Sequence, residues 1–377
     1  MQLSVIKETR EFEKRVALVP DTASKLQNAG IDIVLQSGAG EQSGFSDQSY
    51  IQKGVKIADS FESALNGADL IAKVLPFTEN ELNSVPKSTT QISLLAPGSY
   101  LEIIKLMQVK SMTAFSFELL PRISRAQSMD ALSSQATVSG YVATLTCAIN
   151  LPLFFPMFMT AAGTVPPAKV FVMGAGVAGL QAIATARRLG ANVRAYDVRP
   201  AAAEEVKSLG ATFVTLDLES QEGAGGYAKE QSAEFIQKQQ ELMAEQVAQC
   251  NVIITTAAIP GRPAPKLLTQ KMVEGMAKGS VVFDLAAESG GNCELSKPGE
   301  IIEHDGVKII GARNVPSQLP THASFLYSRN VAELVLLMTK DGNFEPNFED
   351  EIVNGSCVLK NGEIFNEMTK KLIEDSK

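Results

Sequence analysis

The sequence Val170-Phe-Val-Met-Gly-Ala-Gly-Val-Ala-Gly179 decides the fold of this chain. Four apolar residues predict a buried strand, and the Gly-x-Gly-x-x-Gly motif that follows predicts a tight turn into a helix. The helical pattern ends at Gly190, and a second strand pattern runs from there to Asp197. This order of strand, glycine turn, helix and strand with a terminal acid is typical of the βαβ unit that binds dinucleotides.

Each part of this segment has a physical task in holding a dinucleotide. Gly174 permits the tight turn, Gly176 lets the backbone approach a pyrophosphate, and Gly179 lets the helix pack closely against the strand. The helix N-terminus presents N–H groups and a positive dipole end to the phosphates, and the carboxylate of Asp197 can accept both ribose hydroxyls. A glycine-rich turn in an ordinary α/β domain is the alternative, but it does not explain the acid. The cofactor-binding residues predicted from this segment are Gly174, Gly176, Val177, Ala178, Gly179, Asp197, Val198 and Arg199.

The acid at position 197 also predicts which cofactor the site prefers. The 2′-phosphate of NADP would lie beside the Asp197 carboxylate, and like charges about 4 Å apart repel by ~1 kcal/mol in water and ~4 kcal/mol at a protein-like dielectric. Arg199 follows closely, and an arginine there can accommodate a 2′-phosphate, which weakens this argument. We still predict NAD(H) as the cofactor.

Length and composition predict a globular protein of two domains. The chain has 377 residues, of which 45% are hydrophobic and 20% are charged, as expected for domains with cores of their own. The formal net charge of −8 argues against nucleic acid as a partner. The four cysteines lack metal-ligand spacing, so we predict no metal site and a reducing compartment. They are Cys147, Cys250, Cys293 and Cys357.

One apolar segment has about the length of a membrane span. Residues 141–163 carry no charged side chain and would be long enough to cross a bilayer. However, Pro152 and Pro156 would break a helix near its middle, and the segment runs directly into the strand at Val170. We therefore expect a buried helix between the domains, followed by a turn, and no direct membrane span.

The pattern of strands and helices predicts an α/β fold with two doubly wound, Rossmann-like parallel-sheet domains and a cleft between them. The first 120 residues alternate short apolar strands with helical patterns, and the alternation resumes after Asp197, interrupted by a polar, glycine-rich insert at residues 219–232. A helical pattern at Ala323–Leu337 is expected to return the chain to the first domain. The predicted domains are residues 1–135 with about 323–377, and residues 136–322. The strands predicted in the first are Leu3–Ile6, Ile31–Leu35, Leu70–Val74, Gln91–Leu95 and Thr113–Phe117.

A polar segment follows the last of these strands. Residues 121–135 read Pro-Arg-Ile-Ser-Arg-Ala-Gln-Ser-Met-Asp-Ala-Leu-Ser-Ser-Gln. Ligands in open α/β sheets bind beyond the carboxyl ends of the strands, so this segment could face a nicotinamide ring. It could equally be a solvated loop that opens a helix, with Asp130 or Ser128 as its cap. Spacing alone does not favour the first interpretation.

Together these motifs resemble the NAD(H)-binding domain of proton-translocating nicotinamide nucleotide transhydrogenases. The resemblance rests on residues 122–135, on Val-x-Gly-Ala-Gly-Val-Ala-Gly-Leu-Gln-Ala at residues 172–182, and on Ala-Tyr-Asp-Val-Arg at residues 195–199. The opening Lys-Glu-x-x-x-x-Glu-x-Arg-Val-Ala-Leu-Val-Pro, residues 7–20, and the segment Thr255–Pro265 also match. The resemblance covers nearly the whole chain.

The resemblance implies direct hydride transfer from NADH to NADP⁺, with NADP(H) held only on a partner subunit. It implies that Arg122, Asp130 and Ser133 orient the nicotinamide ring, with backbone from Arg122 through Ile123 to Ser124 nearby, and that Gln127 reaches toward the partner nucleotide. These four side chains, Arg122, Gln127, Asp130 and Ser133, are the predicted catalytic residues.

The resemblance also implies further nucleotide contacts and an assembly. A mobile loop that closes over NAD(H) would carry Gly226 and Tyr227, while Gln239 and Ala258 would line the adenosine and ribose. The expected partners are NADP(H)-binding and membrane subunits, with proton translocation through the latter, and the chain is expected to form a homodimer. It would then be cytoplasmic, as a separate subunit peripheral on the inner face of the bacterial cell membrane.

Alanine dehydrogenase is the related alternative. That family uses a first-domain histidine with an arginine and a lysine; Arg15 and Lys73 match the two basic positions, but no histidine does. The two histidines of the chain are His304 and His322, and the segment where one should fall reads Ser93-Leu-Leu-Ala-Pro97. Hydride transfer between two nicotinamides moves no proton at the reacting carbon, so it requires no acid or base. We therefore expect Arg15 and Lys73 to be structural remnants or salt-bridge partners. A third possible function of the chain is that of a non-catalytic NAD-sensing module.

Overall fold

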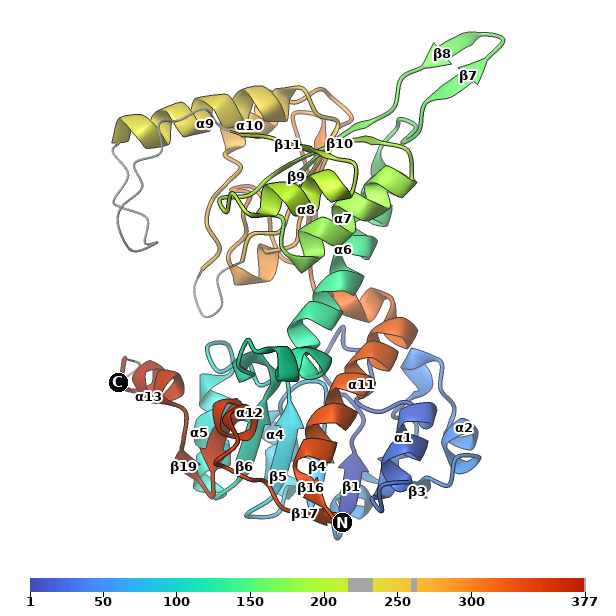
Figure 1. Ribbon diagram of the computed structural model, residues 1–377, viewed down its shortest axis with the longest axis vertical. Helices are drawn as coiled ribbons and strands as arrows, with labels where there is room; N and C mark the ends of the chain where they lie inside the picture. Colours follow the sequence, from blue (N-terminus) through green and yellow to red (C-terminus); the bar gives the residue numbers. More distant parts are fainter. Residues whose placement is uncertain (216–232, 259–262, 376–377) are drawn as a thin grey trace. The chain divides into compact units, whose positions relative to one another are not determined.

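The structure is a computed structural model and describes residues 1–215, 233–258 and 263–375 (Figure 1). The chain divides into two compact units. Unit 1 comprises Met1–Val138 and Pro316–Lys377, and unit 2 comprises Ser139–Val315. Helix α6 (Ala131–Asn150) contributes residues to both. Each unit is built around its own, mainly parallel sheet.

The sheet of unit 1 has eight strands in the order β19-β18-β6-β5-β4-β1-β2-β3. The six strands from β1 to β6 are parallel, and their order is that of a doubly wound fold. Strands β18 and β19 extend one edge in antiparallel pairing. All five strands predicted for this region are present, whereas β3, β18 and β19 are additional. The strands are β1 (Gln2–Val5), β2 (Asp32–Gln36), β3 (Lys56–Ala58), β4 (Leu70–Ala72), β5 (Thr90–Ser93), β6 (Thr113–Ser116), β18 (Cys357–Lys360) and β19 (Glu363–Ile364).

Helices cover both faces of this sheet because its strands are apolar on both sides. In β4, Leu70 and Ala72 join one hydrophobic core, with residues of α1 and α11, whereas Ile71 joins a second core, with residues of α3, α4 and α5. Alternate side chains of a strand point to opposite faces, so a strand buried on both sides needs a helix layer on each. The helices are α1 (Pro20–Gln27), α2 (Asp47–Ile51), α3 (Phe61–Leu65), α4 (Glu79–Ser84), α5 (Leu101–Val109), α11 (Pro320–Leu337), α12 (Glu351–Ser356) and α13 (Glu367–Asp375), with 3₁₀ turns at Glu41–Ser43, Phe117–Leu119 and Ser124–Met129 and a small hairpin of β16 (Thr339–Lys340) and β17 (Asn343–Phe344).

The sheet of unit 2 has seven strands in the order β11-β10-β9-β12-β13-β15-β14. All pairs are parallel except β14 with β15. The parallel strands again follow the doubly wound order, so the α/β fold class with two such sheets is confirmed. The strands are β9 (Lys169–Met173), β10 (Asn192–Tyr196), β11 (Thr212–Phe213), β12 (Val252–Thr255), β13 (Val281–Asp284), β14 (Ile301–His304) and β15 (Val307–Gly311). The helices are α7 (Val177–Arg188), α8 (Ala202–Ser208), α9 (Ala233–Ala248) and α10 (Gln270–Glu274), with a 3₁₀ turn at Ala287–Ser289. A further 3₁₀ turn, Val315–Gln318, lies at the boundary where the chain returns to unit 1.

The uncharged segment at residues 141–163 differs from the expectation of a buried helix followed by a turn. Helix α6 is present, but Ile149 on it is 84% exposed. The chain beyond it forms a hairpin of β7 (Phe158–Thr160) and β8 (Gly163–Val165), which extends away from the rest of unit 2 (Figure 1). The prolines end the helix as predicted, but hydropathy alone does not reveal that the apolar residues after it are exposed. Within the part of the chain that the structure describes, no helix has the length and apolar character needed to cross a bilayer.

Candidate functional site

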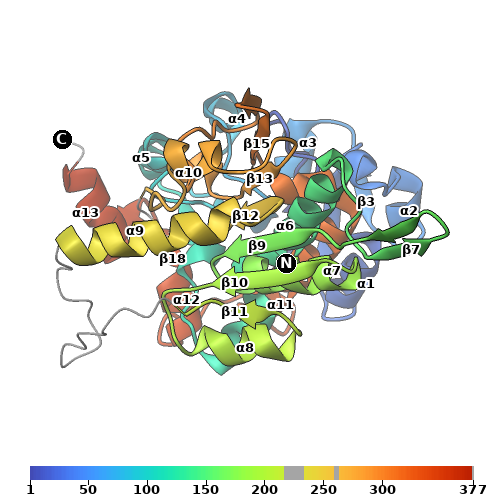
Figure 2. The ribbon, with the colours of Figure 1, turned by 90° about the horizontal axis from the view of Figure 1, so that it is seen from above.

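The glycine motif lies at the point of unit 2 where the order of the strands reverses. Strand β9 lies between β10 and β12 (Figure 2). The connection after β9 leads through the glycine turn into α7 and β10, and the connection after β12 leads to the other half of the sheet. The two connections diverge there, which leaves room beyond the carboxyl ends of the strands, where open α/β sheets bind ligands.

The three glycines have distinct surroundings. Gly174 has a φ of +103°, and a Cβ added to it would lie 2.5 Å from Oγ1 of Thr256. A Cβ on Gly179 would lie 1.9 Å from the carbonyl oxygen of Gly174, so this glycine permits the close contact of helix and turn. A Cβ on Gly176 would meet nothing within 4 Å among the described residues. Packing therefore requires Gly174 and Gly179, whereas the residues that the structure describes leave space beside Gly176.

The N-terminus of α7 opens onto the same space. Gly176 is its N-cap, and among the residues described no side chain caps the helix by a hydrogen bond. The first-turn N–H groups of a helix need an acceptor, and together with the helix dipole they favour an anion. The apolar side chain of Val177, on the first turn, is 42% exposed. The end of α7 thus combines donors for a phosphate with an exposed apolar surface.

The carboxylate of Asp197, just after β10, is held beside the glycine turn. Its Oδ2 accepts a hydrogen bond of 2.7 Å from the backbone N–H of Ala175, and its Oδ1 accepts one of 2.8 Å from the backbone N–H of Arg199. The guanidinium of Arg199 donates to both oxygens, at 2.9 and 3.2 Å. Burial acts to raise the pKa of Asp197, but the hydrogen bonds from Arg199 and Ala175 outweigh it and lower the pKa below its usual value. Asp197 is therefore ionised at neutral pH, and the neighbouring Val198 is exposed.

Two residues that the sequence analysis did not assign hold this site from the side of β12. The hydroxyl of Thr256 donates to the carbonyl of Gly174 at 3.0 Å. The buried amide of Asn292 accepts from the N–H of Ala257 at 3.1 Å and donates to the carbonyls of Ala257 and Pro265 at 2.8 Å each. Thr256 lies in the Thr-Thr-Ala part of the Thr255–Pro265 motif, so the sequence could have indicated a role for it. No motif in the sequence includes Asn292.

In unit 1, the polar loop before α6 combines a helix cap with an exposed face. Oδ1 of Asp130 accepts a hydrogen bond of 2.9 Å from the N–H of Ser133, and Oδ2 accepts one of 2.6 Å from the Ser133 hydroxyl. Asp130 therefore caps α6, as the interpretation of this segment as a loop that opens a helix predicted. Asn330 of α11 donates to the carbonyl of Ser128 at 2.8 Å and anchors the loop. The side chains of Arg122, Ser124 and Gln127 are exposed and that of Ile123 is half-buried. The loop is therefore fixed at its base and presents polar groups to its surroundings.

Arg15 and Lys73 are buried in unit 1 and already have partners. Arg15 forms a bidentate ion pair with Glu13, with a closest distance of 2.6 Å, and donates to Oε1 of Gln135 at 2.9 Å. Lys73 Nζ lies 3.5 Å from Oε2 of Glu8 and 3.4 Å from Oε1 of Glu81. Glu8 and Lys73 follow β1 and β4, the adjacent strands at which the order of this sheet reverses. Both basic residues are thus salt-bridge partners within the unit.

Burial raises the pKa of Glu8 to about 7, against the attraction of Lys73. Its Oε1 accepts a hydrogen bond of 2.6 Å from the N–H of Val74, while in the described part of the chain Oε2 has no hydrogen-bond partner. The pKa of Glu13 is lowered because the charge and hydrogen bonds of Arg15 outweigh burial. Burial thus moves the pKa of Glu8 toward neutral pH, whereas Arg15 holds the pKa of Glu13 below its usual value.

Some predicted residues cannot be placed at the site. Gly226 and Tyr227, with the rest of the insert, lie outside the described residues, and so does the side chain of Gln239 in α9. Ala258 is described and exposed at the end of the segment that follows β12.

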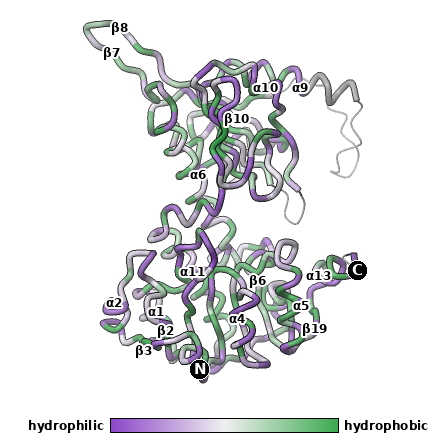
Figure 3. Tube along the Cα trace, turned by 180° about the vertical axis from the view of Figure 1, so that it is seen from behind, coloured by the Kyte–Doolittle hydropathy of each residue, from purple (hydrophilic) through white to green (hydrophobic). Residues whose placement is uncertain are grey.

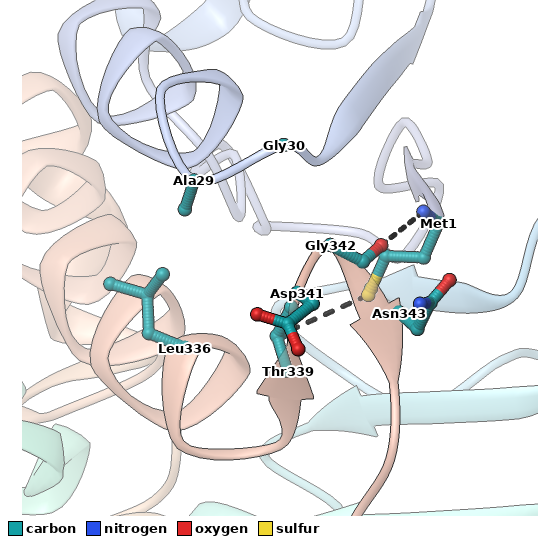
Figure 4. Close-up of a pocket in the computed structure, with 8 residues that line it drawn as sticks. All are labelled: Met1, Ala29, Gly30, Leu336, Thr339, Asp341, Gly342 and Asn343. Carbon is teal, nitrogen blue, oxygen red and sulfur yellow. Dashed lines mark hydrogen bonds between the residues drawn. The ribbon is translucent and has the colours of Figure 1, made fainter.

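A shallow pocket elsewhere in unit 1 lacks such a set of functional groups (Figure 4). The terminal amino group of Met1 donates to the carbonyl of Gly342 there, and Asp341 is the acid among its lining residues. Asp341 is the one titratable side chain among its lining residues, so we do not treat this pocket as a candidate active site. It is lined by Met1, Ala29, Gly30, Leu336, Thr339, Asp341, Gly342 and Asn343.

Comparison with known proteins matches both segments of the chain to one family. Residues 4–139 match the alanine dehydrogenase/PNT N-terminal domain, and residues 143–367 match the alanine dehydrogenase/PNT C-terminal domain. The chain is 44% identical over 370 aligned residues to NAD(P) transhydrogenase subunit alpha of Cereibacter sphaeroides, covering 97% of this chain and 71% of that one. It is 27% identical to alanine dehydrogenase 1 of Staphylococcus aureus, covering 97% of this chain and 95% of that one.

A solved structure agrees with this assignment. The crystal structure of transhydrogenase from Sinorhizobium meliloti superposes with a TM-score of 0.86 at 40% identity, covering 98% of this chain and all of that one. Similarity at this level extends through both units.

Proposed function

The chain belongs to the alanine dehydrogenase/PNT family, and we propose from this that it works as the NAD(H)-binding component of a proton-translocating nicotinamide nucleotide transhydrogenase. Its more similar relatives are transhydrogenase subunits, and alanine dehydrogenase is more distant. The observation that carries the proposal is the cradle of unit 2. In the described part of the chain, the space at Gly176, the end of α7 without a side-chain cap and the ionised Asp197 lie together there.

These residues fit the parts of NAD(H). The backbone at Gly176 and the first turn of α7 can donate to the pyrophosphate, since no Cβ fills the approach. The carboxylate of Asp197 can accept the adenosine ribose hydroxyls, and exposed Val198 offers an apolar surface beside them. We assign Gly226, Tyr227, Gln239 and Ala258 to the same nucleotide on the resemblance alone. NADP(H) would be held by the partner subunit.

The contribution of this chain to catalysis would be to hold the nicotinamide ring of NADH in position for hydride transfer to the partner nucleotide. When bound, NADH supplies the hydride that passes to NADP⁺ on the partner. We propose that Arg122, Asp130 and Ser133 orient the nicotinamide ring and that Gln127 sets its distance to the partner nucleotide. The hydrogen bonds of Asp130 to Ser133 and of Asn330 to the loop backbone support this, because they hold the base of the loop in one conformation.

Unit 1 lacks a histidine at the position that the resemblance assigns to amino-acid oxidation by alanine dehydrogenases. That reaction exchanges a proton at the substrate, and no histidine lies in the first 300 residues. Arg15 and Lys73, the candidates for binding a substrate carboxylate, are buried and paired with Glu13, Glu8 and Glu81. We therefore propose that the chain has no alanine dehydrogenase activity.

We further propose that the chain forms a homodimer and acts, through its partner subunits, at the inner face of the bacterial cell membrane. Support for self-association comes from the hairpin of β7 and β8 and the residues leading to it, where Met159 is 75% exposed and Phe154 is 56% exposed. Much of this segment is hydrophobic (Figure 3), and residues 131–168 carry no charge. Several exposed large apolar side chains in an uncharged segment are typical of a surface that binds a partner.

The reaction can be tested by reconstitution. Mixed with an NADP(H)-binding domain of the same family, the chain should transfer hydride from NADH to an NADP⁺ analogue. It should not catalyse the reductive amination of pyruvate by ammonia and NADH. Gln127→Asn should slow the transfer on the order of a hundredfold, because a misplacement of ~1 Å has that effect, while NADH affinity changes by no more than a few-fold. Ser128→Ala, at an exposed neighbour in the same loop, is the matched control and should leave the rate unchanged. A normal rate for Gln127→Asn would exclude the assigned role of this loop.

A further inference from the structure

The carboxylate of Asp197 has all of its acceptor positions in use. An ionised carboxylate offers about four lone-pair sites. Two receive backbone donors, the N–H of Ala175 and the N–H of Arg199. The other two receive Nε and one terminal nitrogen of the Arg199 guanidinium, at 2.9 and 3.2 Å. A ligand that needs this carboxylate as an acceptor must displace one of these donors.

The backbone donors are fixed, whereas the guanidinium can leave. Both N–H groups belong to the turns that shape the site, since Ala175 lies between the first two glycines of the motif. The side chain of Arg199 is 61% exposed, and its further contact is a bond of 3.2 Å to the carbonyl of Ala175. The carboxylate of Asp197 is only 8% exposed, so it must keep two donors, but water can solvate the departing guanidinium while a new pair of donors takes its place.

We propose that Arg199 is an internal competitor for the nucleotide, a specificity-determining residue whose forked donors occupy on Asp197 the two positions that the ribose 2′- and 3′-hydroxyls require. This inference rests on the proposed function, in which Asp197 binds the adenosine ribose. The guanidinium and the vicinal diol each present two adjacent donors, so they exclude one another. Binding of NAD(H) therefore releases the Arg199 side chain from the carboxylate.

The released guanidinium affects NADP(H) in the opposite direction. A nucleotide with a 2′-phosphate offers one hydroxyl fewer to Asp197 and places negative charge beside it. Arg199, once free, can donate to that phosphate as a fork. Arg199 thus weakens the binding of NAD(H) and strengthens the binding of NADP(H). It therefore reduces the preference for NAD(H) over NADP(H) that Asp197 creates.

The test is Arg199→Ala, with dissociation constants measured by calorimetry for NADH and NADPH. Removal of the competitor should tighten NADH binding by up to about fivefold and weaken NADPH binding. Arg199→Lys keeps the charge but lacks the fork, so it should also tighten NADH binding, by a smaller factor. Arg188→Ala, which removes an exposed arginine at the far end of α7, is the control for net charge and should change neither constant.

The outcomes separate the inference from the proposed function. Opposite changes for the two nucleotides in Arg199→Ala would support competition. Weaker binding of both would show that Arg199 attracts nucleotides through its charge or contacts NADH directly, and unchanged NADH binding would show that it does not compete; either result overturns the inference and leaves the proposed function standing. Failure of the unmodified chain to bind NADH would overturn both.

Discussion

Alanine substitutions at Gly176 and Gly179 should separate nucleotide binding from folding. At Gly179 an added Cβ would lie 1.9 Å from the Gly174 carbonyl oxygen, whereas a carbon and a carbonyl oxygen approach to about 3.3 Å. The helix or the turn must then move by about 1.4 Å. At Gly176 the same Cβ has no neighbour within 4 Å in the described part of the chain, and φ is −77°, which alanine adopts freely.

The expected magnitudes differ accordingly. Overpacking of this kind costs about 1–3 kcal/mol, so Gly179→Ala should lower the Tm of the transition of unit 2 by roughly 2–10 °C. Gly176→Ala should unfold at the same temperature or slightly higher, because alanine restricts the unfolded chain by about 0.4–1 kcal/mol more than glycine. Its effect should be on NADH, since the methyl group stands where the pyrophosphate would approach. Loss of one or two charge-assisted hydrogen bonds is worth about 1.5–3 kcal/mol each, which weakens binding tenfold or more.

Differential scanning calorimetry and NADH titration on both variants would test this reasoning. Wild-type NADH affinity in Gly176→Ala would mean that the space at Gly176 is not the phosphate site. Wild-type stability in Gly179→Ala would mean that the contact between α7 and the turn does not constrain the fold. Loss of stability in both variants would refute the distinction between them.

Two further predictions concern the buried carboxylate and the hairpin. The pKa of Glu8 is raised from 4.5 to about 7 in the folded chain, so the folded state holds the Glu8 proton more tightly than the unfolded state does. The free energy of unfolding should therefore fall by about 3 kcal/mol as pH rises from about 5 to above 7. Urea unfolding of Glu8→Gln across that range should show a flatter pH dependence, and an unaltered slope would exclude Glu8 as its source. Met159→Asp, on the exposed hairpin, should shift the chain from dimer to monomer in sedimentation with normal NADH affinity, whereas a wild-type sedimentation coefficient would argue against the hairpin as the interface.

The parts of the fold and site that local sequence determines could be predicted. Alternating strands and helices predict a parallel sheet, and right-handed connections leave only a few strand orders, of which the doubly wound order is one. The glycine turn and Asp197 lie close together in sequence, so their spacing predicts their geometry, and Ala175 does donate to Asp197. The cap of α6 by Asp130 was one of two local alternatives, and the structure places it there.

Contacts that join distant segments could not be predicted in the same way. The bond from Thr256 to Gly174 spans 82 residues of sequence, and the bonds from Asn292 to Ala257 span 35. Such contacts depend on which strands become neighbours in the sheet. The hairpin shows a second limit, because an uncharged apolar segment has the same hydropathy whether a core buries it or a partner covers it.

The roles of Arg15 and Lys73 follow from their ion-pair partners in the structure and could not be inferred from their residue types alone. An arginine and a lysine at these positions suit either a substrate carboxylate or internal ion pairs, and their identity does not distinguish the two. The structure places three acids, Glu8, Glu13 and Glu81, against these two bases, so the buried cluster already carries an excess of carboxylates. An entering amino-acid carboxylate would have to displace Glu13 from a bidentate pair or add negative charge in a region of low dielectric, and either change is costly. The two bases that could bind a substrate carboxylate at the first sheet are thus already paired with acids of their own unit, which argues against amino-acid oxidation there.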